Sequence, residues 1–328
     1  MKLVIDMMGG DHGTKTTIEA VKQFVQLHKD CEIFAVGNEE EIKELNGLPL
    51  VHIVPSKTVL PMDADPMSAM KTLDSSLMVG IQAFLDNGCD GLISAGSTGA
   101  LLTASIFKIK RLQGIKRPCL ITSFPTIIDN KRFVACDLGA NASDTKEELE
   151  QFAMMGSLYY SILYNEEHPK VYLLNNGTEE EKGNPLTKET YQLLKVNPHI
   201  NFKGNLEGRD AMKGEADVIV CDGFTGNIFL KTLEGTAKAM GSMMKDAFKM
   251  NLSTKIGYLF AKKGIKAMIK KMDYKNVGGA LLLGVNGIVI KSHGSSEAKS
   301  FLASMESAYN LAKQDLIGKI KVRLDSNE

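Results

Sequence analysis

The sequence has no excess of charge of either sign and no long apolar run. Its 328 residues include 39 basic and 39 acidic side chains, so no overall field attracts nucleic acid, and a charged partner must be met by a local patch. Nowhere do about eighteen apolar residues follow one another. No charged leader precedes an apolar stretch before the first strand-like run, residues 2–5. We therefore expect neither a membrane-spanning nor a secreted protein, and no nucleic-acid partner.

The common catalytic and cofactor motifs are also missing. There is no G-x-x-x-x-G-K-[ST] loop, no convincing G-x-G-x-x-G, no G-x-S-x-G elbow, and no histidine spacing typical of a metal site. We therefore expect no metal and no cofactor. The five cysteines form no C-x-x-C pair and mostly lie inside or at the ends of apolar runs, which indicates buried free thiols in a reducing cytosol: Cys31, Cys89, Cys119, Cys136 and Cys221.

Short apolar runs alternate with longer helical patterns along the whole chain. Residues 3–6 precede a helical pattern at 16–27, a second helical pattern covers 66–85, and residues 91–94 precede one at 100–109. This alternation predicts an α/β protein with a mostly parallel sheet and helices on both faces, a three-layer arrangement. No Pro- or Ser-rich linker, low-complexity tract or repeat interrupts it. We therefore expect one α/β catalytic domain over residues 1–328.

Residues 245–275 form an exception, a basic amphipathic segment with nine lysines against Asp246 and Asp273. Its apolar side chains fall into two stripes: Leu252, Ile256, Leu259 and Phe260, then Ile265, Met268, Ile269 and Met272. We expect two short helices with a bend near Gly264, protruding from the domain. The segment could be a solvated helical face, a docking surface for an acidic protein, or a helix lying on anionic lipid. The apolar stripes favour the last two.

Four turns rich in Gly, Ser, Thr and Asn follow apolar strand-like runs: residues 7–13, 94–99, 137–141 and 222–227. Glycine lets the backbone turn sharply and present its N–H groups, and a following helix adds its positive end, so such turns can bind anions. A βα turn needs glycine and helix caps even without a ligand. Four together favour a crevice at one edge of the sheet that holds a phosphate or a polarised carbonyl.

Two polar residues near these turns have both an ordinary and a functional interpretation. Lys182 lies in a polar loop where lysines are usually solvated, but it could neutralise an anion. Asn227 follows the last turn, where it could cap a helix or donate its amide to a developing oxyanion. His293 lies in a Gly-rich turn and could contact a ligand.

Read in order, the motifs closely resemble the PlsX family of phosphate acyltransferases. The resemblance runs nearly end to end and rests on residues 6–11, 94–101, 117–118, 137–141, 151–156, 182–184, 207–209, 220–227, 278–280, 283–287 and 293–296. It implies a fold similar to isopropylmalate dehydrogenase and phosphotransacetylase. It also implies transfer of a long-chain acyl group from acyl carrier protein to inorganic phosphate, giving acyl phosphate for phospholipid synthesis. The family is usually homodimeric and associates peripherally with membrane, so we expect a cytoplasmic protein at an anionic membrane surface.

The resemblance places the chemistry at Lys182 and Asn227. We expect substrate contacts at Asp6, Gly9, Gly10, Asp11, Gly96, Ser97, Thr98, Gly99, Asn141, Asn184, Asp222, Thr225 and His293. Membrane or carrier-protein contacts are expected at Leu259, Phe260, Lys262, Lys263, Lys266, Ile269 and Lys270.

Our mechanistic hypothesis is direct attack of a bound phosphate oxygen on the thioester carbonyl, without an acyl-enzyme. Backbone N–H groups of residues 9–10 and 96–99, with Lys182, would hold phosphate, and Asn227 would stabilise the oxyanion. Two alternatives stay open: a nicotinamide-dependent oxidoreductase on the same sheet architecture, and a membrane-attached scaffold that binds acyl carrier protein.

Overall fold

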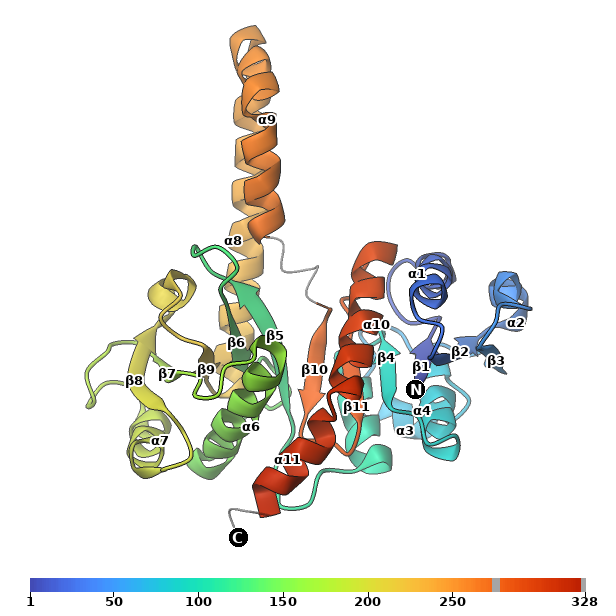
Figure 1. Ribbon diagram of the computed structural model, residues 1–328, viewed down its shortest axis with the longest axis horizontal. Coiled ribbons are helices and arrows are strands. Elements are labelled where there is room, and N and C mark those ends of the chain that lie inside the picture. The colour runs from blue at the N-terminus through green and yellow to red at the C-terminus, as the bar shows by residue number, and fades with distance from the viewer. Residues whose placement is uncertain (273–277, 326–328) are drawn as a thin grey trace.

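The computed structural model describes residues 1–272 and 278–325, which form an α/β body around one eleven-stranded sheet (Figure 1). From one edge to the other the strands are β3 (Val51–Pro55), β2 (Glu32–Gly37), β1 (Lys2–Asp6), β4 (Gly91–Ser94), β11 (Ile288–Lys291), β10 (Ala280–Leu283), β5 (Cys119–Pro125), β6 (Arg132–Cys136), β9 (Val218–Val220), β7 (Val171–Asn175) and β8 (Phe202–Glu207).

The sheet consists of two parallel blocks that run in opposite directions. Strands β3, β2, β1, β4 and β11 are parallel to one another and form the first block, while β6, β9, β7 and β8 are parallel and form the second. Between them, β10 is antiparallel to both β11 and β5, and β5 is antiparallel to β6. The carboxyl ends of the two blocks therefore lie at opposite edges of the sheet.

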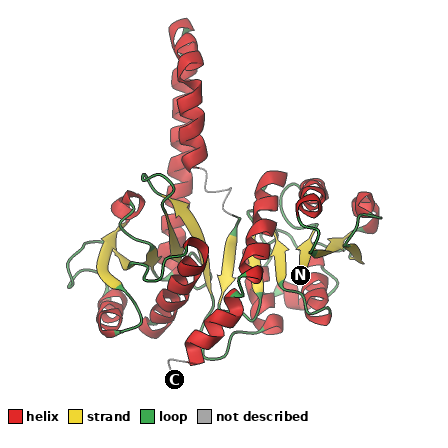
Figure 2. Cartoon of the chain, in the orientation of Figure 1, coloured by secondary structure: helices red, strands yellow, loops and turns green. Residues whose placement is uncertain are grey.

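Helices cover both faces of the sheet (Figure 2). They are α1 (Thr14–Leu27), α2 (Glu39–Ile42), η1 (Lys43–Leu45), α3 (Ser68–Lys71), α4 (Ser76–Asp86), α5 (Thr98–Ala104), η2 (Ser105–Ile109), α6 (Lys146–Tyr164), α7 (Pro185–Val196), η3 (Gly208–Lys213), α8 (Gly223–Lys249), α9 (Leu252–Met272), α10 (Ala298–Lys313) and α11 (Leu316–Asp325). The predicted fold class, a mostly parallel sheet between helices, is confirmed.

Alternate side chains of the strands enter two separate cores. Leu3 and Ile5 of β1 pack with Phe24 of α1 on one face, while Val4 packs with Ile81 of α4 on the other. Both cores are fully apolar at these positions. This two-sided burial explains why the strands read as continuous apolar runs.

The predicted helix over 66–85 is wrong in one respect, because the structure has two helices there, α3 and α4. The hydroxyl of Ser75 accepts a hydrogen bond from the backbone N–H of Met78 and so begins α4 anew. Ser75 also forms a β-bridge with Thr58, and its backbone N–H donates to the carbonyl of Thr72 at 3.1 Å, which closes residues 72–75 as a turn.

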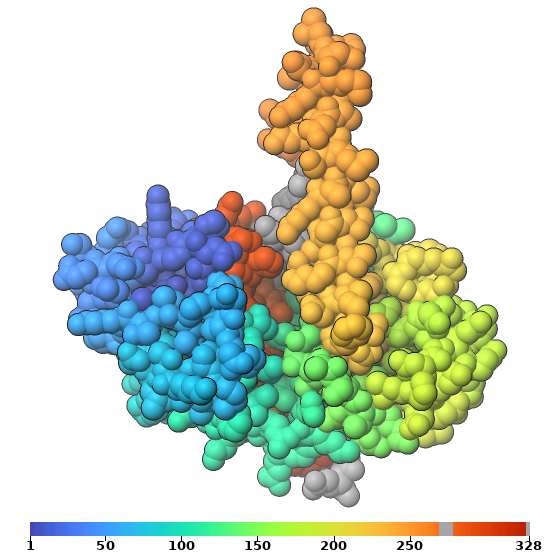
Figure 3. All heavy atoms as spheres, turned by 180° about the vertical axis from the view of Figure 1, so that it is seen from behind, coloured from blue at the N-terminus to red at the C-terminus, as the bar shows by residue number. Residues whose placement is uncertain are grey.

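Helices α8 and α9 project beyond the body and pack against each other (Figures 1 and 3). The predicted bend near Gly264 is wrong: α9 continues through that residue, and the chain reverses at Met250 and Asn251 instead. The side chain of Asn251 accepts a hydrogen bond from the backbone N–H of Thr254 at 2.9 Å, which caps α9. A glycine inside a helix costs only about 1 kcal/mol, which is too little to end it.

Across residues 1–272 and 278–325, no helix combines the length and the apolarity needed to cross a membrane.

Candidate functional site

Three turns of the first block meet at the carboxyl ends of β1, β4 and β11. The carboxylate of Asp6 accepts hydrogen bonds from the backbone N–H of Gly9 at 3.2 Å and from the hydroxyl of Ser94 at 2.6 Å. The backbone N–H of Asp11 donates to the carbonyl of Gly294 at 2.8 Å. We call residues 6–11, 94–99 and 291–296 the first turn group.

The backbone amides of the first turn group are only partly available to an anion. The N–H of Gly9 donates to Asp6, and that of Gly96 donates to the Ser94 hydroxyl at 3.1 Å, so these two predicted phosphate donors already have acceptors. The N–H groups of Gly10 and Ser97 have no acceptor within the described part of the chain. Thr98 and Gly99 begin α5, and the Ser97 hydroxyl caps it.

A second turn group, residues 137–141 and 222–227, follows β6 and β9 in the second block. Its centre is Asp137, whose fully buried carboxylate accepts backbone hydrogen bonds from Leu120, Ala140 and Asn141. Burial raises the pKa of the Asp137 carboxyl, and these hydrogen bonds offset part of the rise. The Asn141 amide donates to Asp137 and to the carbonyl of Pro118, both at 2.9 Å. These side chains hold the turn together.

Asp222 caps α8, and its two oxygens accept hydrogen bonds from the backbone N–H and the hydroxyl of Thr225 at 2.9 and 2.7 Å. Asn227 is therefore not the cap that the sequence allowed but an exposed residue of the helix's second turn. It lies against Gly139, where a Cβ atom would be 3.0 Å from the Asn227 Cβ. Gly139 has φ +112°, a conformation that favours glycine, so the turn and the asparagine fit each other only with glycine there.

Asp144, which the sequence analysis did not select, lies behind the start of α8. One carboxylate oxygen accepts a hydrogen bond from the backbone N–H of Gly223 at 2.9 Å, and the other is buried without a partner among the residues described. Burial raises the pKa of the Asp144 carboxyl to about 6, with further increases from the charges of Asp137, Glu148 and Asp222.

Lys182 lies in the loop after β7 and is exposed, while its carbonyl accepts a hydrogen bond from the Asn175 side chain at 3.2 Å. Asn184 caps α7 by accepting from the backbone N–H of Thr187 at 2.9 Å. Strand β7 neighbours β9, so the Lys182 loop and the start of α8 lie at the same edge of the sheet.

The predicted single crevice at one edge is wrong, because the reversed second block puts its turns at the other edge. Helix α8 runs between the two blocks (Figure 3) and contacts both turn groups, at Gly139 and at His293. Asn227, Lys231 and Glu234 share one helical face, and a Glu234 carboxylate oxygen lies 3.9 Å from Nε2 of His293. Seven residues of helix span about 10 Å, which is the separation of Asn227 and Glu234 along the axis.

His293 and Lys291 belong to the first turn group. His293 Nδ1 accepts from the backbone N–H of Ser295 at 3.3 Å, which leaves Nε2 as the protonated nitrogen of the neutral ring, facing Glu234. Lys291 was not among the predicted site residues, although it is the single charge at the end of the apolar run 288–290. Its side chain is only 9% exposed, and its ammonium donates to the carbonyls of Ala95, at 3.0 Å, and Ser292.

All five cysteines are free and buried, as predicted. Burial raises the pKa of the Cys89 thiol to about 11, and burial raises those of Cys119 and Cys221 as well. These thiols stay protonated near neutral pH and are poor nucleophiles. Within the described residues no three His, Cys, Asp or Glu side chains are placed to hold a metal ion.

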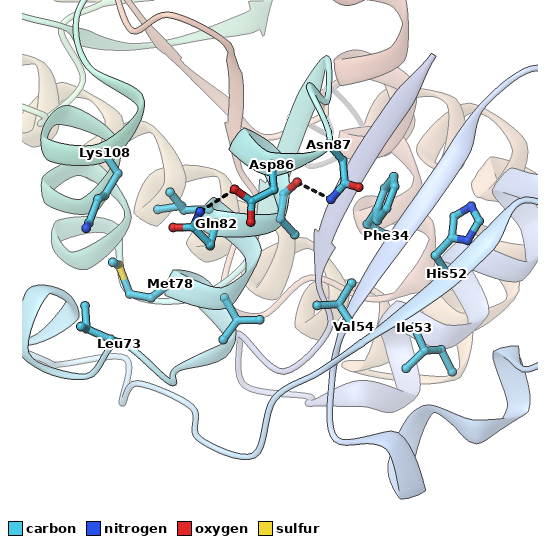
Figure 4. Close-up of a pocket in the computed structure, with 13 residues that line it drawn as sticks. Phe34, His52, Ile53, Val54, Leu73, Met78, Gln82, Asp86, Asn87 and Lys108 are labelled. Atoms are coloured by element: carbon cyan, nitrogen blue, oxygen red, sulfur yellow. Dashed lines mark hydrogen bonds between the residues drawn. The ribbon is translucent and has the colours of Figure 1, made fainter.

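A cavity of about 580 Å³ lies beside β2, β3 and α4 (Figure 4). Its lining includes Phe34, Val54, Leu73 and Met78, with the Gln82 amide hydrogen-bonded to Asp86 at 2.7 Å. None of the predicted site residues lines it, so it is distinct from both turn groups.

The predicted membrane or carrier contacts lie on α9. Leu259 and Phe260 are 68% and 86% exposed, and Lys262, Lys263 and Lys266 are also exposed. The side chains of Ile269 and Lys270 lie outside the described residues.

The architecture is that of the phosphotransacylase class of α/β folds. A phosphotransacetylase from Streptococcus pyogenes superimposes with a TM-score of 0.60, covering 96% of this chain and 94% of that one at 19% identity. A branched-chain phosphotransacylase from Enterococcus faecalis V583 gives 0.59, covering 95% and 99% at 15% identity. These similarities support the predicted fold.

Sequence comparison defines the family. Residues 1–319 match the family described as "Fatty acid synthesis protein". Proteins named "Phosphate acyltransferase" from Staphylococcus aureus strains bovine RF122 / ET3-1 and MRSA252 are each 42% identical over 330 residues, covering the whole of both chains. The chain belongs to this fatty acid synthesis protein family, and the resemblance seen in the sequence motifs is confirmed.

Proposed function

We propose that this protein is a phosphate acyltransferase that moves a long-chain fatty acyl group from acyl carrier protein to inorganic phosphate, giving acyl phosphate for phospholipid synthesis. The observation that carries the proposal is the 42% identity, over the full length of both chains, to proteins of that name. The two turn groups joined by α8 support it, because one offers unpaired backbone donors for an anion and the other presents an exposed amide.

In the proposed reaction, a phosphate oxygen attacks the thioester carbon directly, the C–S bond breaks, and the carrier leaves with its sulfur. The first turn group holds phosphate through the free N–H groups of Gly10 and Ser97. The amide of Asn227 donates to the oxyanion, and Lys182 adds positive charge at the same edge of the sheet. Because the buried thiols have raised pKa values, they are poor nucleophiles, which favours direct attack by phosphate over an acyl-enzyme intermediate on cysteine.

The test incubates the purified protein with acyl carrier thioester and phosphate, and measures hydroxylamine-sensitive acyl phosphate. We predict that Lys182→Ala and Asn227→Ala each lower kcat about a hundredfold or more, because each removes a donor to developing charge. Both side chains are exposed, so circular dichroism should show an unchanged fold. Wild-type turnover in both variants would contradict these roles, and absence of acyl phosphate with wild-type protein would contradict the proposed function.

We also propose that the protein acts in the cytoplasm as a homodimer at an anionic membrane surface. Support for the membrane surface comes from the projecting pair α8 and α9, whose apolar residues Met243, Leu252, Leu259 and Phe260 are 71%, 74%, 68% and 86% exposed. Lysines neighbour this apolar surface, a combination typical of helices that lie at a lipid interface.

A further inference from the structure

Lys291 presents a buried positive charge whose direct hydrogen-bond partners are all neutral. Only 9% of the residue is exposed, and its two hydrogen-bond acceptors are the neutral carbonyls of Ala95 and Ser292. No carboxylate within the described residues forms an ion pair with it. A buried charge without a counter-charge is costly, so such a lysine is expected where an anion arrives.

The nearby carboxylates, Asp6 and Asp11, form no ion pair with the Lys291 ammonium among the described residues. Asp6 accepts hydrogen bonds from Met8, Gly9 and Ser94 instead of from the Lys291 ammonium. Burial lowers the pKa of the Lys291 ammonium to about 8, while the charges of Asp6 and Asp11 raise it and that of Lys231 lowers it. Lys291 is therefore within electrostatic reach of another cation that comes from the second block.

Lys231 approaches from α8, one helical turn beyond Asn227. Its ammonium lies 3.4 Å from a carboxylate oxygen of Glu234, and the other oxygen of Glu234 faces His293. Glu234 is buried and thus holds this stretch of α8 beside the first turn group. An ammonium has three donors, and that of Lys291 uses two, so one donor is left for an anion between the two lysines.

We propose that the phosphate substrate binds between Lys291 of β11 and Lys231 of α8, next to the free N–H groups of Gly10 and Ser97. This inference rests on the proposed function for the identity of the anion. In this proposal, Lys291 of the first block and Lys231 of α8, which follows the second block, bind phosphate together. Lys182 then acts on the acyl donor. Charge-assisted hydrogen bonds to a doubly charged anion are among the stronger polar contacts in proteins.

The test uses the full chain with inorganic phosphate and three variants, Lys231→Met, Lys291→Met and, as matched control, Lys238→Met two turns further along α8. We expect Lys231→Met and Lys291→Met to raise the KM for phosphate about tenfold or more, with the KM for acyl carrier thioester unchanged within about twofold. Lys238→Met should match the wild type. In parallel, added phosphate should raise the thermal midpoint of the wild type and of Lys238→Met, and much less that of the other two.

Lys291→Met removes hydrogen bonds to two turns and could impair folding, whereas the Lys231 side chain is exposed. If Lys291→Met does not fold, the result for Lys231→Met decides the outcome. A wild-type phosphate KM and full phosphate protection in Lys231→Met would overturn the inference. If the wild type is protected by phosphate but makes no acyl phosphate, the proposed function fails while the anion site stands. If it makes acyl phosphate and the variants keep their phosphate KM, the inference fails alone.

Discussion

Two glycines of α8 offer a paired test of how that helix is held against the second turn group. A Cβ atom at Gly226 would overlap the carbonyl oxygen of Asp137 and lie 2.8 Å from Sγ of Cys221. At Gly235, nothing lies within 4 Å of the same added atom. Both positions are inside the same helix, so alanine gives the same gain in helix propensity at each, about 0.5–1 kcal/mol.

We predict opposite effects for the two substitutions. Gly235→Ala should keep or raise the free energy of unfolding, by up to about 1 kcal/mol. Gly226→Ala must push the helix away from rigid backbone, and overpacking of this kind costs about 1–3 kcal/mol. The propensity gain is the same at both positions and cancels, so the two variants should differ by the overpacking cost alone, about 1–3 kcal/mol in the free energy of unfolding, measured by urea denaturation followed by circular dichroism.

Turnover gives a second measurement on the same pair. A displacement of about 1 Å can lower a rate about a hundredfold, and Gly226 directly precedes Asn227. We expect Gly226→Ala to lose most acyl phosphate formation in native buffer, and Gly235→Ala to keep it. If Gly226→Ala equals the wild type in both stability and turnover, the close fit of α8 on the Asp137 turn does not position Asn227.

Two further predictions concern charge. Asp144→Asn should stabilise the protein above pH 6: the folded pKa of about 6 exceeds the ordinary 3.8, so stability is lost as pH rises from about 4 to 6. A pKa shift of this size corresponds to at most about 3 kcal/mol in the free energy of unfolding. Because solvent screens this partly exposed carboxyl group, we expect a gain of about 1 kcal/mol. A variant that is less stable than the wild type in urea at pH 7 would contradict this prediction. Lys262→Glu, Lys263→Glu and Lys266→Glu combined should abolish cosedimentation with anionic vesicles while acyl phosphate formation in solution continues, and unchanged binding would argue against lipid contact through these lysines.

The sequence pattern predicted the alternation of strands and helices, a mostly parallel sheet with helices on both faces, and the turns that follow β1, β4, β6 and β9, but it did not identify every strand. It could not predict strand direction in the middle of the sheet. Residues 281–283 are three leucines, and such a run reads the same in either direction. The antiparallel placement of β10 between β11 and β5 depends on long-range pairing. Its two reversals cancel, so β5 runs in the direction of the first block, and the antiparallel pairing of β6 with β5 divides the predicted single crevice into two turn groups.

Site residues were predictable by type but less so by role. Asp222, Asn141 and Asn184 stand in the turns, as the motifs require, yet their side chains bond to the protein's own backbone. A polar residue in a βα turn fits capping and ligand binding equally well until its partners are known. Lys291 was missed because its significance comes from burial, which depends on elements up to 196 residues away in the chain.

Helix α8 is continuous from Gly223 to Lys249, and at 1.5 Å per residue its 27 residues form a rod about 40 Å long. Its inner end is seated on the Asp137 turn, and its outer end stands clear of the body beside α9 (Figure 1). The helix therefore contacts the body at two places, at the Asp137 turn and, further along, where Glu234 lies 3.9 Å from His293 of the first block. If the outer end binds a membrane as proposed, one continuous helix carries the membrane-binding surface at that end and Asn227, the proposed oxyanion donor, near its inner end.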